Sequence, residues 1–192
     1  MHVYDGIDDR LAQWLTSQPV FFVGTAPLGG DGHVNVSPKG MAGTFAVFDR
    51  RRVGYLDYYG SGSETIAHLR ENGRITLMFA AFDGRPTIVR LYGKGRIVLT
   101  QDEEFQSLRT AFPKQRVVAQ RAIVMVELDR VSDSCGYAVP RMDFVADRTV
   151  LDLRQEKKGP VPYRAYPETK NAQSIDGLPA LEDLVERTRP PG

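Results

Sequence analysis

The sequence predicts a mainly β protein, an antiparallel barrel that carries a few helices. Three observations predict this class. Apolar runs of strand length follow one another over residues 20–131, and most are separated by short turns rich in Gly, Asp and Pro. Strands joined by tight turns pair antiparallel, and six or seven of them are best closed as a barrel, which leaves no free edge. With 192 residues, 42% of them hydrophobic, the chain is long enough to bury one full core.

The expected elements follow in order along the chain. Ile7, Leu11, Trp14 and Leu15 have helical spacing within residues 5–18, which predicts an amphipathic helix packed on the barrel. The expected strands cover residues 20–26, 33–37, 44–48, 53–59, 74–82, 87–99 and 121–131. Two further helices are expected, one after the glycine-rich turn at residues 60–63 and one over residues 101–112.

Residues 1–150 are expected to form this single domain, with residues 151–192 as a C-terminal arm. Six of the twelve prolines lie between Pro160 and Pro191, among charged residues and with little periodicity. We expect the arm to be partly extended and to pack on the barrel or on a partner subunit.

Composition excludes several classes of protein. Lys and Arg number 25 against 24 acidic residues, so a net charge of +1 gives no bulk attraction to nucleic acid or to a membrane. No apolar run approaches the roughly 18 residues of a membrane span. The single cysteine, Cys135, forms no internal disulfide, suits a reducing cytoplasm, and is expected to be a buried small residue. The three histidines do not share metal-ligand spacing, so no metal is expected, and His68 is expected to be packed or solvated.

The helix start after the strand at residues 53–59 resembles an anion site. Gly60-Ser61-Gly62-Ser63-Glu64-Thr65 lets the backbone approach a phosphate, which the free N–H groups and dipole of a helix start favour. Ser61 and Glu64 also match a capping box, so a well-capped surface helix is an equally good interpretation. A dinucleotide-binding fingerprint is disfavoured, because its third glycine is absent and hairpins do not build a parallel sheet.

Two cations could meet an anion at this helix start. Ser37 and Lys39 lie at a strand end where Pro38 is expected to break the ladder, so Lys39 can face a phosphate. Arg90 lies inside an apolar strand and needs an anionic or hydrogen-bonding partner. Taken singly, each is better interpreted as a solvated surface cation, but the two together favour an anion site.

The order of these segments resembles the pyridoxamine 5'-phosphate oxidase-like family, the FMN-binding split barrels, over about residues 20–100. The resemblance implies a homodimer with FMN in a groove between two antiparallel split β-barrels. The cofactor-binding residues that it implies are Ser37, Lys39, Ser61, Ser63, Thr65 and Arg90. It assigns no catalytic residue.

Two departures from the family pattern argue against pyridoxamine phosphate as the substrate. Glu64 and Thr65 stand where the oxidases carry a basic residue, and the chain after Val131 has no histidine for an Arg-x-His substrate clamp. The expected function is therefore a cytoplasmic, FMN-dependent oxidoreductase acting on an unidentified small molecule. A deazaflavin-dependent reductase on the same fold remains an alternative, as does a non-catalytic barrel that carries flavin or haem or serves in interactions.

Overall fold

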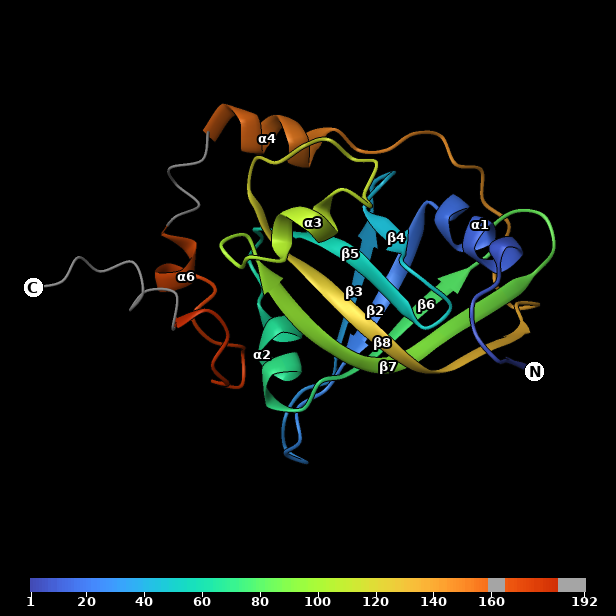
Figure 1. Cartoon of the computed structure of the whole chain (residues 1–192), viewed down its shortest axis with the longest axis horizontal. Helices are drawn as coiled ribbons and strands as arrows, with labels where there is room; N and C mark the ends of the chain where they lie inside the picture. Colours follow the sequence, from blue (N-terminus) through green and yellow to red (C-terminus); the bar gives the residue numbers. More distant parts are fainter. Residues whose placement is uncertain (159–164, 183–192) are drawn as a thin grey trace, which may run out of the picture.

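Eight antiparallel strands form one curled sheet in the computed structural model, which describes residues 1–158 and 165–182 (Figure 1). The strands are β1 (His2–Tyr4), β2 (Val20–Thr25), β3 (Asn35–Gly40), β4 (Phe45–Val47), β5 (Arg52–Tyr58), β6 (Arg74–Ala80), β7 (Thr87–Leu99) and β8 (Gln120–Cys135). The helices are α1 (Asp9–Ser17), α2 (Glu64–Glu71), α3 (Phe105–Arg109), α4 (Val150–Lys158) and α6 (Tyr166–Thr169). The prediction of a mainly β, antiparallel fold with a few helices is confirmed.

The sheet is a split barrel, as the family resemblance implied, and not the closed barrel expected from the run of hairpins alone. Its order is β3-β2-β6-β7-β8-β5-β4, with β1 paired to β8. Among residues 1–158 and 165–182 no ladder joins the end strands β3 and β4, so both remain edges. All the pairings are antiparallel, which removes the dinucleotide-binding interpretation.

A smaller apolar cluster, around Leu56 and Ile123, lies on one face of the sheet, and the main apolar cluster lies on the other face. Phe21, Phe45 and Phe79 pack there with ring centroids 5.0–5.5 Å apart, the favoured range for aromatic pairs. The expected amphipathic helix is α1, but it begins at Asp9 and not at residue 5, because the Asp8 carboxylate accepts the Leu11 N–H at 2.8 Å and so caps the first turn.

Four local predictions were wrong. Strand β3 runs through Pro38 instead of ending before it, because β3 is an edge strand and Pro38 needs no N–H partner on its outer side. The helix expected over 101–112 is the five-residue α3. Strand β8 continues to Cys135, and that extension pairs with β1, a strand that was not expected.

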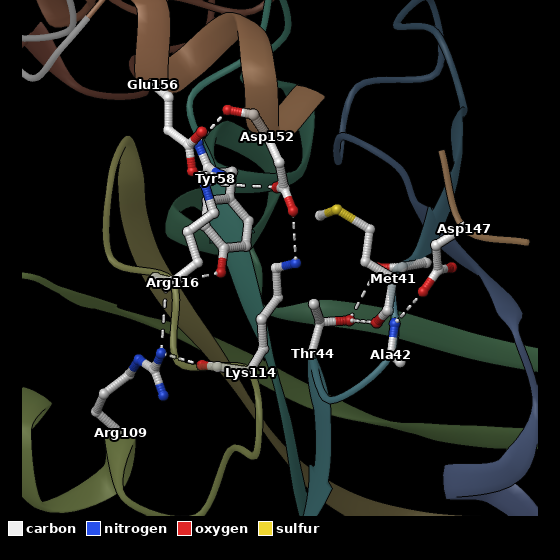
Figure 2. Close-up of polar contacts among 11 residues, drawn as sticks. Met41, Ala42, Thr44, Tyr58, Arg109, Lys114, Arg116, Asp147, Asp152 and Glu156 are labelled. Atoms are coloured by element: carbon white, nitrogen blue, oxygen red, sulfur yellow. Dashed lines mark hydrogen bonds and ion pairs between the residues drawn. The ribbon is translucent and has the colours of Figure 1, made fainter. Parts of the chain in front are cut away.

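Helix α4 lies against the loop that precedes β8, and charged groups make this contact (Figure 2). Asp152 lies 3.1 Å from Lys114 Nζ and 3.4 Å from Arg116 Nε, and Glu156 lies 2.9 Å from Arg116 Nη1. Tyr58 donates its hydroxyl to the Arg116 carbonyl at 3.2 Å. The first part of the expected C-terminal arm is thus a helix held by ion pairs.

Candidate functional site

A chain of hydrogen bonds joins β3 to the first turn of α2. Ser37 Oγ donates to Asn35 Oδ1 at 3.0 Å, and Asn35 Nδ2 donates to Thr25 Oγ1 at 3.2 Å and to Thr65 Oγ1 at 3.1 Å. His68 Nδ1 lies 3.0 Å from the same Thr25 hydroxyl. Two of the predicted site residues, Ser37 and Thr65, therefore lie in one polar network.

His68 is fully buried within this network, on the inner side of α2. Its Nε2 has no hydrogen-bond partner among the described residues. Burial lowers the pKa of His68, and the charges of Asp176, Glu71 and Glu64 oppose that shift. The neutral imidazole is therefore the form that the fold favours, as expected for a packed histidine.

Beside this network, Lys39 and Arg121 share one buried carboxylate. Asp57 is 3% exposed, and its two oxygens lie 3.1 Å from Lys39 Nζ and 2.6 Å from Arg121 Nε. Burial alone would raise the pKa of Asp57, but the charges of Arg121 and Lys39 outweigh it and lower the pKa to about 2. The three groups together carry a net charge of +1.

The start of α2 differs from the predicted capping box. Ser63, not Ser61, is the N-cap, and its side chain makes no capping hydrogen bond. Ser63 Oγ donates instead to the Gln173 carbonyl in the C-terminal arm, at 2.9 Å. Glu64 is the first helical residue, and its carboxylate lies over Gly62, where a Cβ would meet Oε2 at 2.5 Å.

The arm holds the loop that leads into α2. Asn171 is fully buried, and its Nδ2 donates to the carbonyls of Gly60 at 3.1 Å and Gly62 at 3.4 Å. Arg121 Nη1 donates to the Gly62 carbonyl as well, at 3.0 Å. The helix start thus faces its own C-terminal segment.

The two remaining predicted residues lie apart from this cluster. Ser61 is exposed in the loop before α2. Arg90 pairs across the sheet with Met78 and Ser132, whereas its neighbours Val89 and Leu91 are buried in the core. Its guanidinium lies on the outer face and donates to Ser134 Oγ at 3.0 Å.

The sequence analysis missed five members of the site: Thr25, Asn35, Asp57, His68 as a network member, and Arg121. Two of them had a signal in the sequence. Asp57 interrupts the apolar β5 and Arg121 opens the apolar run of β8, and a buried charge inside a strand needs a partner of opposite sign. Neither segment says which charge pairs with which, because that depends on the register of β5 with β8.

Comparison with known proteins assigns the chain to a family. The family model for pyridoxamine 5'-phosphate oxidase matches residues 7–135, about two thirds of the chain. This chain belongs to the pyridoxamine 5'-phosphate oxidase family. It is similar to the pyridoxamine 5'-phosphate oxidase family protein ustO of Aspergillus flavus, at 38% identity over 198 residues that cover 95% of this chain and 78% of that protein.

Solved structures of low sequence identity share the fold. HupZ of Group A Streptococcus matches with a TM-score of 0.54 and 17% identity, over 71% of this chain and 99% of that one. Its H111A variant gives the same TM-score at 19% identity, over 67% of this chain and 99% of that chain. These matches support the split-barrel architecture and carry no statement about activity.

The side chains between β3 and α2 are of the chemical types that bind a phosphate group. Ser37 and Thr65 supply hydroxyls, and Lys39 and Arg121 supply cations of which Asp57 neutralises one. The loop residues fit it less well, because Ser63 is engaged by the arm and the Glu64 carboxylate lies at the helix start. No group of three or more acidic, His or Cys side chains suited to a metal occurs in the part of the chain that the structure describes. Nor has any helix there the length and apolar content needed to cross a bilayer.

Proposed function

We propose that this protein is an FMN-binding oxidoreductase whose cofactor phosphate binds between β3 and the first turn of α2. The observation that carries the proposal is that Asp57 holds two cations between β3 and the start of α2. Lys39 follows Ser37 by two residues on β3, and the buried Arg121 donates to the Gly62 carbonyl before α2. Family membership supports a flavin phosphate as the anion. The substrate is a small molecule that the site does not identify.

Each residue would have a defined part in binding. Lys39 and Arg121 would neutralise the phosphate, while Asp57 holds both cations in place through its two oxygens. Thr65 would donate its hydroxyl hydrogen, because its oxygen already accepts from Asn35 Nδ2. Ser37 would first have to turn its hydrogen away from Asn35 Oδ1. Flavin, when bound, supplies hydride or one-electron chemistry.

A homodimer completes the proposal, since Arg90 lies on the outer face of the sheet. Phe22 and Met78 occupy the same cross-strand row and are half-buried there. Partly exposed apolar side chains around an arginine are typical of the centre of a protein interface. A second barrel packed on this face would bring Arg90 next to a flavin ring held between the subunits, where its charge would stabilise the reduced anion. Sedimentation equilibrium should give twice the chain mass, and Met78→Glu should shift it to the monomer.

The test of the cofactor is a visible absorption spectrum of the purified protein, followed by titration with FMN while flavin fluorescence is recorded. We expect saturable quenching near one FMN per chain. Lys39→Ala should weaken this binding about tenfold or more, as expected for a lost charge-assisted contact. Lys157→Ala, on an exposed residue of α4, is the matched control. FMN affinity that is equal in wild type and Lys39→Ala would remove Lys39 from the site.

The same titration separates the alternatives. A deazaflavin phosphate presents the same anion. If the protein prefers a deazaflavin to FMN, the proposed cofactor changes to deazaflavin, but the proposed phosphate site stays the same. Reduction of the bound flavin by NADH or NADPH with turnover would establish an enzyme, whereas stable binding without turnover would indicate a carrier.

A further inference from the structure

A cavity lies away from this site, at the other end of the barrel (Figure 1). It has a volume of about 700 Å³ and lies between α1 and the ends of β7 and β8. None of Ser37, Lys39, Thr65 and Arg121 lines it. In Figure 1, α1 and α2 lie on opposite sides of the barrel. The volume is within the range of small-molecule sites, about 300–1,000 Å³.

Apolar groups form one wall of the cavity. Leu11 and the half-buried Trp14 come from the inner face of α1, and Val89 and Pro86 come from β7 and the turn before it. An indole ring beside aliphatic side chains offers a flat apolar surface to a ring-shaped ligand. The body of the ligand is therefore expected to be aromatic.

The charges in the lining leave two cations available. The two carboxylates are occupied: Asp8 accepts the Leu11 N–H at 2.8 Å, and Asp133 accepts the Tyr4 hydroxyl at 2.7 Å and the His2 N–H at 2.9 Å. Arg10 and Arg85 have no hydrogen bond or ion pair to a side chain within residues 1–158 and 165–182. The cavity thus pairs an aromatic wall with two unengaged guanidinium groups, which are suited to a carboxylate.

Tyr4 and Asp133 hold each other in place at this end of the cavity, and Asp133 keeps its negative charge. Burial and the Asp133 carboxylate raise the pKa of Tyr4 to about 12, so its hydroxyl keeps its proton at neutral pH. The hydrogen bond from Tyr4 also lowers the pKa of Asp133. Because Asp133 is ionised and has its donors in Tyr4 and His2, a ligand carboxylate is expected at the arginines and not at this end of the cavity.

We propose that this cavity binds a small aromatic carboxylate, with the ring against Trp14 and the carboxylate at Arg10 and Arg85. The site shares no residue with the phosphate site, and its one link to the flavin proposal is Ser134, a lining residue that accepts the hydrogen bond from Arg90. It stands as a second ligand site in the same barrel.

The chain offers two unique reporters for this cavity. Trp14 is the only tryptophan, and Cys135, which also lines the cavity, is the only cysteine. The prediction that Cys135 is buried was wrong, since its side chain is exposed and free. A ligand in the cavity should change the tryptophan fluorescence and slow the reaction of the thiol with Ellman's reagent.

The test titrates the full-length protein with 3-phenylpropanoate and, in parallel, with the uncharged 3-phenylpropan-1-ol. We expect saturable changes in both reporters with the acid, and binding of the alcohol that is about tenfold weaker or more. The double variant Arg10→Gln/Arg85→Gln should bind the acid more weakly by a similar factor and should bind the alcohol with unchanged affinity. Arg148→Gln, an exposed arginine outside the lining, should bind the acid like the wild type.

Three results would overturn the proposal: no saturable binding of the acid, equal binding of acid and alcohol, or acid affinity that is unchanged in the double variant. Circular dichroism of each variant checks that its fold is intact. FMN titration of the same samples distinguishes the two sites, because a protein that does not bind the acid should still bind FMN with unchanged affinity if only this cavity proposal is wrong.

Discussion

The C-terminal arm contacts the barrel in two places, and different forces hold the two contacts. Near α2, Ala180 and Leu181 are 0% exposed and pack with Ile66 and Ala67 in an apolar cluster. At α4 the contact is made by the ion pairs of Asp152 and Glu156, while apolar side chains of that helix remain exposed. One part of the arm is therefore part of the core, and the other part rests on its surface.

The difference shows which part of the arm is a lasting neighbour of the candidate site. Apolar burial contributes about 25 cal/mol per Å² and is insensitive to salt, whereas partly exposed ion pairs contribute about 1 kcal/mol or less and are screened. We therefore expect residues 171–181 to stay on the α2 loop under conditions that release α4. The network around Asp57 lies under the strongly held part.

The largest effect is expected at Asp57. Asp57→Asn keeps the shape but leaves Lys39 and Arg121 without their counterion, which should lower the free energy of unfolding by about 3–5 kcal/mol. Asp49→Asn removes an exposed ion pair with Arg52 and should cost about 1 kcal/mol or less. Urea unfolding of both variants measures the contrast, and equal losses would show that the buried network is no stronger than a surface pair.

The same carboxylate predicts a response to acid. The pKa of Asp57 is about 2 in the fold and near its ordinary value, 3.8, in the unfolded chain. A carboxyl with a lowered pKa stabilises the fold above the unfolded value, so this contribution should be lost as the pH falls from about 4 to about 2. Asp57→Asn should show a shallower loss over that window in acid titrations followed by circular dichroism.

Next in size is the apolar anchor of the arm. Leu181→Ala should lower the free energy of unfolding by about 2–5 kcal/mol, because it opens a cavity beside Ile66. Leu153→Ala on α4 removes the same atoms from a side chain that is 60% exposed, and should change stability by about 0.5 kcal/mol or less. If the two variants lose the same stability, the arm near α2 is not a core element.

His68 offers a test near neutral pH. Its pKa is lowered in the fold, so the unfolded chain binds a proton more readily and stability should fall as the pH drops below about 6.5. His68→Gln should reduce this slope between pH 7 and 5.5, as measured by urea unfolding at each pH. A slope unaffected by the substitution would mean that another group titrates there.

The smallest effect is expected at α4. Asp152→Asn should lower stability by about 1 kcal/mol or less, and 0.5 M NaCl should reduce the difference from the wild type. Amide exchange over residues 150–158 should nevertheless rise in the variant, while exchange over residues 171–181 stays unchanged. Parallel increases in both segments would mean that the arm docks as one unit.

Alternation and turn chemistry were enough to predict most of the sheet. The strands and hairpins from Val20 to Leu99 were expected, because their apolar residues repeat every second position and Gly, Asp or Pro separates them. The split between β3 and β4 was not predictable in this way, because closure depends on the curl of the whole sheet. Likewise Pro38 was read as a strand end, although only its edge position decides that it is tolerated.

The residues of the candidate site were named in part, and their role in binding a cofactor stays a prediction. Lys39 was named for its place near an expected strand end, and Ser37 and Thr65 were implied by the family resemblance. Their actual partners, such as Asp57 for Lys39, come from distant segments whose approach only the register fixes. The engagement of Ser63 by Gln173 was out of reach, since the arm has no periodicity that would place it.

Strand β8 decides when the two parts of the sheet can join. It hydrogen-bonds to β1, β5 and β7, and without it the order of the sheet separates into β3-β2-β6-β7 on one side and β4-β5 on the other. A nascent chain that has emerged only to residue 119 therefore exposes two half-sheets with unpaired inner edges, which are open to pairing with other chains. Synthesis of residues 120–135 is the step that joins the halves, so a pause of the ribosome before this point would favour aggregation over folding.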